Sequence, residues 1–152
     1  VLVEDLIAEL QSVHRTHTFR IDQNQEINVY ADRERITQVI TNLVNNAVKY
    51  SPYHTEVVVS LYIKNCKAVL EVRDQGKGIP EEQGHNLFVR FGQVAKSDMS
   101  MGLGLGLYIS KEIVTQEGGE IWYESETGQG STFCFSLPLK DGVQLGIPIR
   151  RD

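Results

Sequence analysis

The segment RERITQVITNLVNNAVKYS, residues 33–51, combines an apolar helical pattern with three asparagines in five positions. Its apolar residues recur every three or four positions, as on one face of an α-helix. These residues are Ile36, Val39, Ile40, Leu43, Val44 and Ala47. Asp32 can cap the start of this helix, and Ser51-Pro52 predicts its end. We therefore expect a helix that buries one face and carries asparagines beside it.

Polar residues on this helix form a stripe with a specific chemistry. Asn42, Asn46 and Lys49 are four and then three positions apart, so they lie within about 60° of one another on the helix surface. Amide oxygens can ligate a hard cation, and an ammonium group can hold a phosphate. An ordinary solvated helix face is the alternative. It is disfavoured because asparagine is a poor helix former that costs stability.

The flanking segments predict the rest of the fold. Residues 2–13 have helical spacing, and HTFRID and INVYAD are typical of two short strands. EVVVSLYIK (56–64) and KAVLEVRD (67–74) predict a hairpin with a turn at Asn65, and a short helix is expected around NLFVRF. A helix through YISKEIVTQE ends at Gly118-Gly119, before a final hairpin of EIWYESE and STFCFSLPL. This order predicts a two-layer α/β sandwich, with helices on one face of a largely antiparallel sheet.

Composition limits the classes of function. The chain has 152 residues and a net charge of −5, which suits one domain and argues against a sequence-independent nucleic-acid binder. We expect residues 1–139 to form the domain and 140–152 to be a tail or linker. Cys66 and Cys134 show no metal-ligand spacing and are expected to be buried, reduced thiols. No signal peptide or membrane-spanning run is visible, so we expect a cytoplasmic protein with no direct membrane insertion.

Asp74 is a candidate binding residue in the loop DQGKGIP. It is in phase with Leu70 and Val72, and therefore on the apolar face of its strand. A carboxylate there needs a hydrogen-bond donor, and the exocyclic amine of adenine would serve. Gly76 and Gly78 would let the backbone pass close to a flat ligand. The alternative is that Asp74 only opens a surface turn.

The glycine-rich stretch MGLGLGLYIS (101–110) precedes the helix that follows it. Backbone amides of Gly102, Gly104 and Gly106 could point at phosphate oxygens, and the helix dipole adds a favourable field. The leucines between these glycines would anchor the loop. A plain glycine-rich connector is the alternative, and a membrane GxxxG motif is excluded because the flanks are short and polar.

Five motifs in a fixed order carry a family resemblance. N-x-x-x-N-A-x-K-Y, D-x-G-x-G-I-P, F-x-x-F, G-x-G-L-G-L and G-x-G-S-T-F together resemble the catalytic and ATP-binding domain of bacterial sensor histidine kinases. The resemblance implies an α+β Bergerat (GHKL) sandwich, with about three helices on a mixed, mostly antiparallel five-stranded sheet. It also implies ATP and Mg²⁺ as cofactors. The expected enzyme is a histidine protein kinase.

Site residues follow from the resemblance by position. Asn42, Asn46 and Lys49 would be catalytic, with Asn46 as the metal ligand and Lys49 facing phosphate. Asp74 would accept from the adenine amine. The remaining nucleotide-binding residues implied in this way are Tyr50, Gly76, Gly78, Ile79, Phe91, Gly102, Leu103, Gly104, Leu105, Gly106, Leu107 and Thr132. Phe88 and Phe91 would seat a lid formed by VAKSDMS.

The resemblance also implies partners, and it leaves alternatives. Family members transfer phosphate to a histidine on an upstream dimerisation domain and then serve a response regulator. His14, His17, His54 and His85 lack the context of such a phosphoacceptor, and Gln93 stands where many members carry an arginine. A GHKL-type ATPase is one alternative, although gyrase, MutL and related ATPases have a glutamate where Asn42 stands. A non-catalytic nucleotide-sensing or docking module is the other.

Overall fold

The computed structural model describes residues 2–78, 87–88, 105–125 and 128–139. These residues form three helices and five strands. The elements in chain order are α1 (Leu2–Val13), β1 (Thr18–Asn24), α2 (Arg33–Tyr50), β2 (Glu56–Lys64), β3 (Lys67–Arg73), α4 (Leu105–Gln116), β4 (Glu120–Ser125) and β5 (Ser131–Pro138).

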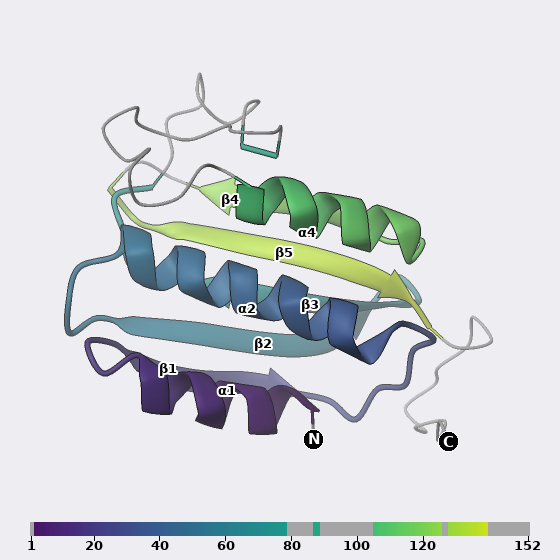
Figure 1. Cartoon of the computed structure of the whole chain (residues 1–152), viewed down its shortest axis with the longest axis horizontal. Helices are drawn as coiled ribbons and strands as arrows, with labels where there is room; N and C mark the ends of the chain where they lie inside the picture. Colours follow the sequence, from purple (N-terminus) through teal and green to yellow (C-terminus); the bar gives the residue numbers. More distant parts are fainter. Residues whose placement is uncertain (1, 79–86, 89–104, 126–127, 140–152) are drawn as a thin grey trace.

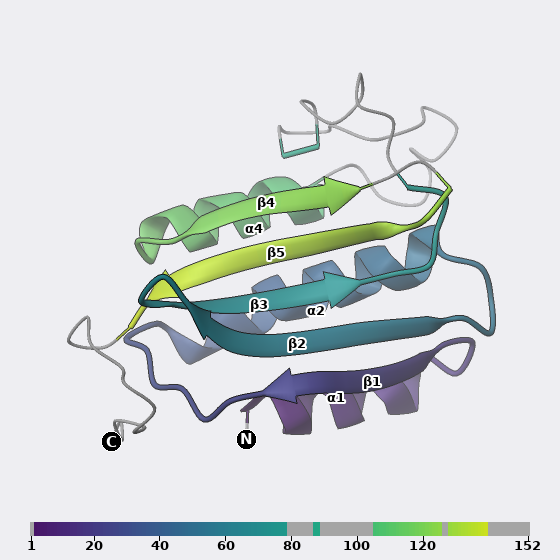
Figure 2. The ribbon, with the colours of Figure 1, turned by 180° about the vertical axis from the view of Figure 1, so that it is seen from behind.

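The strands form a single mixed sheet in the order β1-β2-β3-β5-β4. β1 pairs with β2 in parallel, and the other three pairings are antiparallel. All three helices lie on one face of this sheet (Figure 1), and no described helix covers the opposite face (Figure 2). The predicted two-layer sandwich of three helices and five strands is confirmed.

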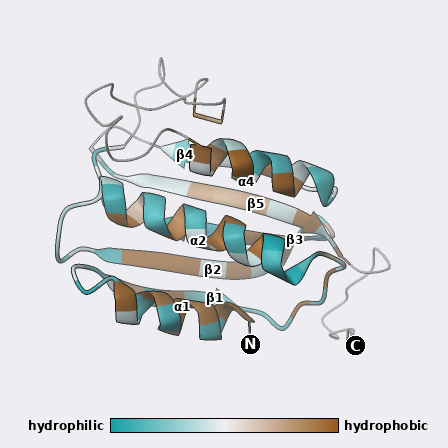
Figure 3. Cartoon of the chain, in the orientation of Figure 1, coloured by the Kyte–Doolittle hydropathy of each residue, from teal (hydrophilic) through white to brown (hydrophobic). Residues whose placement is uncertain are grey.

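The core lies between the three helices and the sheet, and α2 contributes most of its completely buried helical residues. Asp32 caps α2 by accepting hydrogen bonds from the backbone N–H groups of Glu34 and Arg35, at 3.0 and 3.3 Å. The apolar face of the helix then packs on the strands, and Leu43 and Val44 are completely buried. Figure 3 shows alternating hydrophobic and hydrophilic residues along the helices, whereas β2 is hydrophobic over most of its length. The apolar pattern of 33–50 therefore predicts the central helix correctly.

The hairpin of β2 and β3 turns at Asn65 and Cys66. Both residues have positive φ, 53° and 60°, as in the two-residue type I′ turn that suits the twist of paired strands. The predicted turn at Asn65 is confirmed. The expectation of a buried Cys66 is wrong, because the side chain lies in this exposed turn, whereas Cys134 is buried in β5 as expected.

The segment INVYAD is not a strand. Val29 forms one isolated antiparallel bridge with Leu139, and no further pairing follows among the described residues. Leu139 follows directly after β5, which is already paired with β3 on one side and with β4 on the other. The bridge therefore does not extend along β5, and the segment connects β1 to α2.

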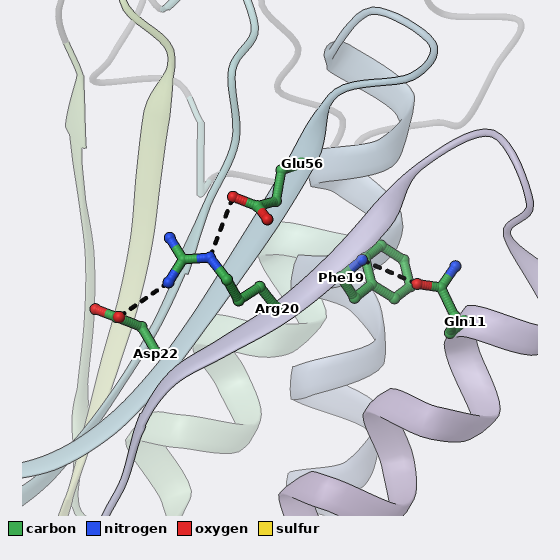
Figure 4. Close-up of polar contacts among 5 residues, drawn as sticks. All are labelled: Gln11, Phe19, Arg20, Asp22 and Glu56. Carbon is green, nitrogen blue, oxygen red and sulfur yellow. Dashed lines mark hydrogen bonds and ion pairs between the residues drawn. The ribbon is translucent and has the colours of Figure 1, made fainter.

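The edge strand β1 is fixed by side chains from both of its neighbours (Figure 4). Gln11 of α1 accepts a hydrogen bond from the backbone N–H of Phe19 at 2.9 Å. Arg20 bridges Asp22 at 3.0 Å and Glu56 of β2 at 3.2 Å. These ion pairs are exposed and contribute little stability. The Gln11 contact has the larger structural role, since it ties the helix to the strand backbone.

The helices α2 and α4 pack side by side in opposite directions. Arg35, near the start of α2, donates to Gln116 at the end of α4 across 2.5 Å. Asn42, farther along α2, contacts Gly106 and Ser110 in the first turns of α4. The end of α2, the start of α4, the end of β3 and the start of β5 consequently meet at one end of the sandwich, on the left in Figure 1. Within the described parts of the chain, no helix is long and apolar enough to cross a membrane.

Candidate functional site

Asp74 is the buried carboxylate at this end of the sandwich. It follows β3 with only 5% of its surface exposed, on the helix-facing side predicted from Leu70 and Val72. Its Oδ1 accepts hydrogen bonds from the backbone N–H of Gly76 at 2.8 Å and of Ser131 at 3.2 Å. Oδ2 receives no hydrogen bond from the described residues. Burial raises the pKa of Asp74, while the two backbone hydrogen bonds act in the opposite direction.

The loop after Asp74 packs directly against the end of α2. A Cβ placed on Gly76 would lie 2.3 Å from the carbonyl oxygen of Tyr50, so any larger residue would push the loop away from the helix. Gly130 makes a similar approach from the β5 side. A Cβ there would lie 2.2 Å from the carbonyl oxygen of Asp74, and its φ of +88° also favours glycine. These contacts hold Asp74 beside the asparagine helix.

Ser131, rather than Thr132, accompanies Asp74. Ser131 is buried and lies in phase with the core residues Phe133 and Phe135. Thr132 pairs with Arg73 in β3, on the sheet face opposite to the helices. The structure therefore does not bring Thr132 to the other candidate residues. Sequence analysis missed Ser131, although a count by twos from Phe133 would have found it.

The asparagine stripe of α2 lies beside the Asp74 loop. Its members Asn42, Asn46 and Lys49 are half-buried, as is the neighbouring Tyr50. The side-chain nitrogen of Asn42 donates to the carbonyl oxygen of Gly106 at 3.3 Å and to Ser110 Oγ at 3.2 Å. Asn46 makes no hydrogen bond with another described residue. Lys49 Nζ lies 5.2 Å from the centre of the Tyr50 ring, in a cation–π contact.

Gly106 lies in the first turn of α4, not in a loop before it. The helix begins at Leu105, so the prediction that Leu105, Gly106 and Leu107 belong to a pre-helical loop is wrong. A Cβ on Gly106 would lie 3.9 Å from Asn42 Cγ, which is an ordinary contact distance. Packing against the described residues therefore does not require glycine here. Gly106 lies at a helix start, a position that favours an anion.

Several predicted site residues lie outside the described residues. They are Ile79, Phe91, Gly102, Leu103 and Gly104, together with Gln93 and the segment VAKSDMS. Phe88 is described and packs edge-on against Phe133, with ring centres 6.2 Å apart. Gly78 is described at the end of the Asp74 loop, where φ is +81°.

The grouped residues could hold a nucleotide and its cation. Among the described residues, the structure brings together Asn42, Asn46, Lys49, Tyr50, Asp74, Gly76 and Gly106. The described part of the chain contains no cluster of three or more histidine, cysteine or acidic side chains that could hold a metal. The amide oxygens of Asn42 and Asn46 accept no hydrogen bond from described residues, which fits a hard cation that takes its other ligands from phosphate and water.

Comparison with known proteins gives the family. A family model described as "Histidine kinase-, DNA gyrase B-, and HSP90-like ATPase" matches residues 31–141. The chain belongs to this family of ATPases. The matched residues include α2, the Asp74 loop, α4 and β5, so the match covers every described residue of the candidate site in this ATPase domain.

Similar proteins include sensor kinases and their catalytic domains. The adaptive-response sensory kinase SasA of Rippkaea orientalis is 36% identical over 91% of this chain, which spans 37% of that protein's length. The solved catalytic domain of the histidine kinase ThkA is 30% identical, with a TM-score of 0.78 over 91% of this chain and 90% of that one. Full-length ShkA in complex with AMPPNP is 27% identical, with a TM-score of 0.78 over 91% of this chain and 29% of that one. The match to ThkA's catalytic domain shows that this ATPase domain has the same fold.

Proposed function

We propose that the domain binds ATP with Mg²⁺ at the end of the sandwich and presents the γ-phosphate to a histidine. That histidine would lie on a dimerisation domain elsewhere in the same protein, and a response regulator would receive the phosphate next. The observation that carries the proposal is the grouping of Asp74, the asparagine stripe and Gly106 at one end of the fold. The relatives support it, because they are sensor kinases much longer than this chain.

Each part of the nucleotide has a proposed contact. Asp74 Oδ2, left without a donor among the described residues, would accept from the adenine amine. Gly76 would let the ring lie close to the loop, and Tyr50 would lie near the nucleoside. Lys49 would face the phosphates, and the lack of a side chain at Gly106 would let a phosphate approach the start of α4.

The amide side chain of Asn42 favours phosphoryl transfer to a histidine over hydrolysis of ATP. An ATPase that activates water needs a carboxylate or another base within reach of that water. Asn42 offers an amide, which cannot accept the proton. Mg²⁺, when bound through Asn46 with help from Asn42, would neutralise phosphate charge. Phosphoryl transfer otherwise depends mainly on placement, which these residues would provide by orienting the triphosphate.

The test is a phosphate-transfer assay with the protein that contains both domains. Incubation with γ-labelled ATP and Mg²⁺ should label a histidine, giving an acid-labile and alkali-stable phosphoprotein. ATP binding without label would instead indicate a non-catalytic docking module. Release of free phosphate by this domain alone, at a rate equal to that of the complete protein, would favour the hydrolytic ATPase.

A further inference from the structure

Ser110 is a completely buried hydroxyl on the face of α4 that packs against α2. Its exposed fraction is 0%, and the other buried residues of the helix are the apolar Leu107, Ile113 and Val114. Alanine would suit a buried helix position better, because it buries no polar group and favours the helix. The hydroxyl has one partner among the described residues, the side-chain nitrogen of Asn42, at 3.2 Å.

The contacts of Asn42 define which way its amide points. Gly106 and Ser110 are four residues apart, so they lie on the same face of α4 and both reach Asn42. The Gly106 carbonyl oxygen can only accept a hydrogen bond, and therefore the group that faces it must be the NH₂ of Asn42. The amide oxygen of Asn42 is then turned away from these two acceptors.

We propose that Ser110 is a positioning residue that holds the Asn42 amide with its nitrogen on α4 and its oxygen free for the cation of the bound nucleotide. This inference rests on the proposed function for the identity of the ligand. Without the hydroxyl, the NH₂ group keeps a single acceptor at 3.3 Å, and rotation about the side chain becomes less restricted. Ser110 thereby acts on the metal-dependent part of binding and leaves adenine recognition at Asp74 unchanged.

The test compares Ser110→Ala with the matched control Ser136→Ala. Ser136 is 2% exposed, and its hydroxyl has no hydrogen-bond partner among the described residues. It lies in phase with Thr132 on the sheet face away from the helices, paired with Val69. The measured quantity is the gain in affinity for AMPPNP on addition of Mg²⁺. We expect Ser110→Ala to reduce this gain about fivefold to tenfold, as for loss of one hydrogen bond, while adenosine affinity stays unchanged.

Two results would overturn the inference. The first concerns the gain in AMPPNP affinity on addition of Mg²⁺: the inference is wrong if Ser110→Ala keeps the full gain, or if Ser136→Ala reduces the gain by the same factor as Ser110→Ala. The second comes from nuclear magnetic resonance of the ligand-free wild-type protein, and it stands even where Ser110→Ala does not fold. The side-chain NH₂ protons of Asn42 should exchange with solvent more slowly than those of Asn46, and equal exchange contradicts the proposed orientation. A wild-type domain that binds no AMPPNP would refute the proposed function. Normal AMPPNP binding by the wild type, together with either result above, would refute only the role of Ser110.

Discussion

The backbone N–H of Ser131 donates to the Asp74 carboxylate across 3.2 Å, which joins the start of β5 to the end of β3. The same carboxylate oxygen accepts from Gly76, so one oxygen of Asp74 maintains the fold of the loop. The other oxygen receives no hydrogen bond from the described residues. The structural and the proposed ligand-binding roles of Asp74 are therefore divided between two atoms, and a substitution can separate them.

Asp74→Asn should weaken the binding of adenine nucleotides and leave the fold intact. Asparagine retains one oxygen for the Gly76 and Ser131 donors, but it places an NH₂ group where the adenine amine would donate. We expect affinity for an ATP analogue to fall about tenfold to a hundredfold, as for loss of a charged hydrogen bond. A fluorescent-nucleotide titration and a thermal melt measure the two effects. Asp22→Asn, an exposed change on β1, should alter neither, and unchanged affinity in Asp74→Asn would remove Asp74 from the site.

The raised pKa of Asp74 predicts a specific dependence of stability on pH. Burial raises this pKa above its ordinary value of 3.8, so the folded state binds the Asp74 proton more tightly than the unfolded state does. The contribution of Asp74 to the free energy of unfolding is then fully present below pH 3.8 and is lost as pH rises through the folded-state pKa. Asp74→Asn lacks this titration. Urea unfolding over a pH series should show wild type losing stability relative to the variant as pH rises, and the opposite slope would indicate a lowered pKa.

Gly106→Ala should separate folding from phosphate binding. Among the described residues, a Cβ at Gly106 meets only Asn42, at an ordinary distance, and alanine favours a helix by up to about 1 kcal/mol. We expect the free energy of unfolding to stay constant or to rise, while the affinity for ATP falls more than the affinity for adenosine. Calorimetric titration with both ligands measures this difference. If the variant binds ATP as wild type does, no phosphate approaches Gly106.

Asn46→Ala should abolish the Mg²⁺ dependence of triphosphate binding. The neighbour Asn45 gives a matched control, since it is exposed and hydrogen-bonded to His14 at 2.8 Å. Asn45→Ala removes an amide from the same turn of α2 and should leave the Mg²⁺ dependence intact. The measurement is the dissociation constant of AMPPNP with and without Mg²⁺. A Mg²⁺ effect that survives in Asn46→Ala would make the asparagine stripe an ordinary helix surface.

The fold was predictable where the spacing of apolar residues reflects which side chains are buried. The apolar spacing of 33–50 marks the buried face of α2, and the apolar segments 56–64 and 67–74 form β2 and β3 as expected. INVYAD also has a pattern typical of a strand, but strand formation also needs an unoccupied neighbouring edge, and the local sequence does not contain that information. Cys66 was misassigned because its apolar neighbours belong to strands, whereas the residue itself lies in the turn between them.

The candidate site was predictable in its residue types and less so in its geometry. Counting by twos placed Asp74 on the correct face, and the same count from Phe133 indicates Ser131 instead of Thr132. Both donors to Asp74 are backbone N–H groups. Gly76 lies two residues along the same loop, whereas the position of Ser131 depends on how β3 and β5 pair, and single-residue patterns do not report this pairing. The start of α4 at Leu105 was missed because glycines lower the helix propensity of the first turn, which tertiary packing against α2 overrides.

The most direct test of the central claim is a map of backbone amide shifts on addition of AMPPNP and Mg²⁺. Binding at the proposed site predicts the largest changes at Asn46, Gly76, Gly106 and Ser131, with residues such as Arg20 on the edge strand β1 unaffected. Changes confined to other parts of the fold, or none at saturating nucleotide, would contradict the claim that this end of the sandwich holds ATP.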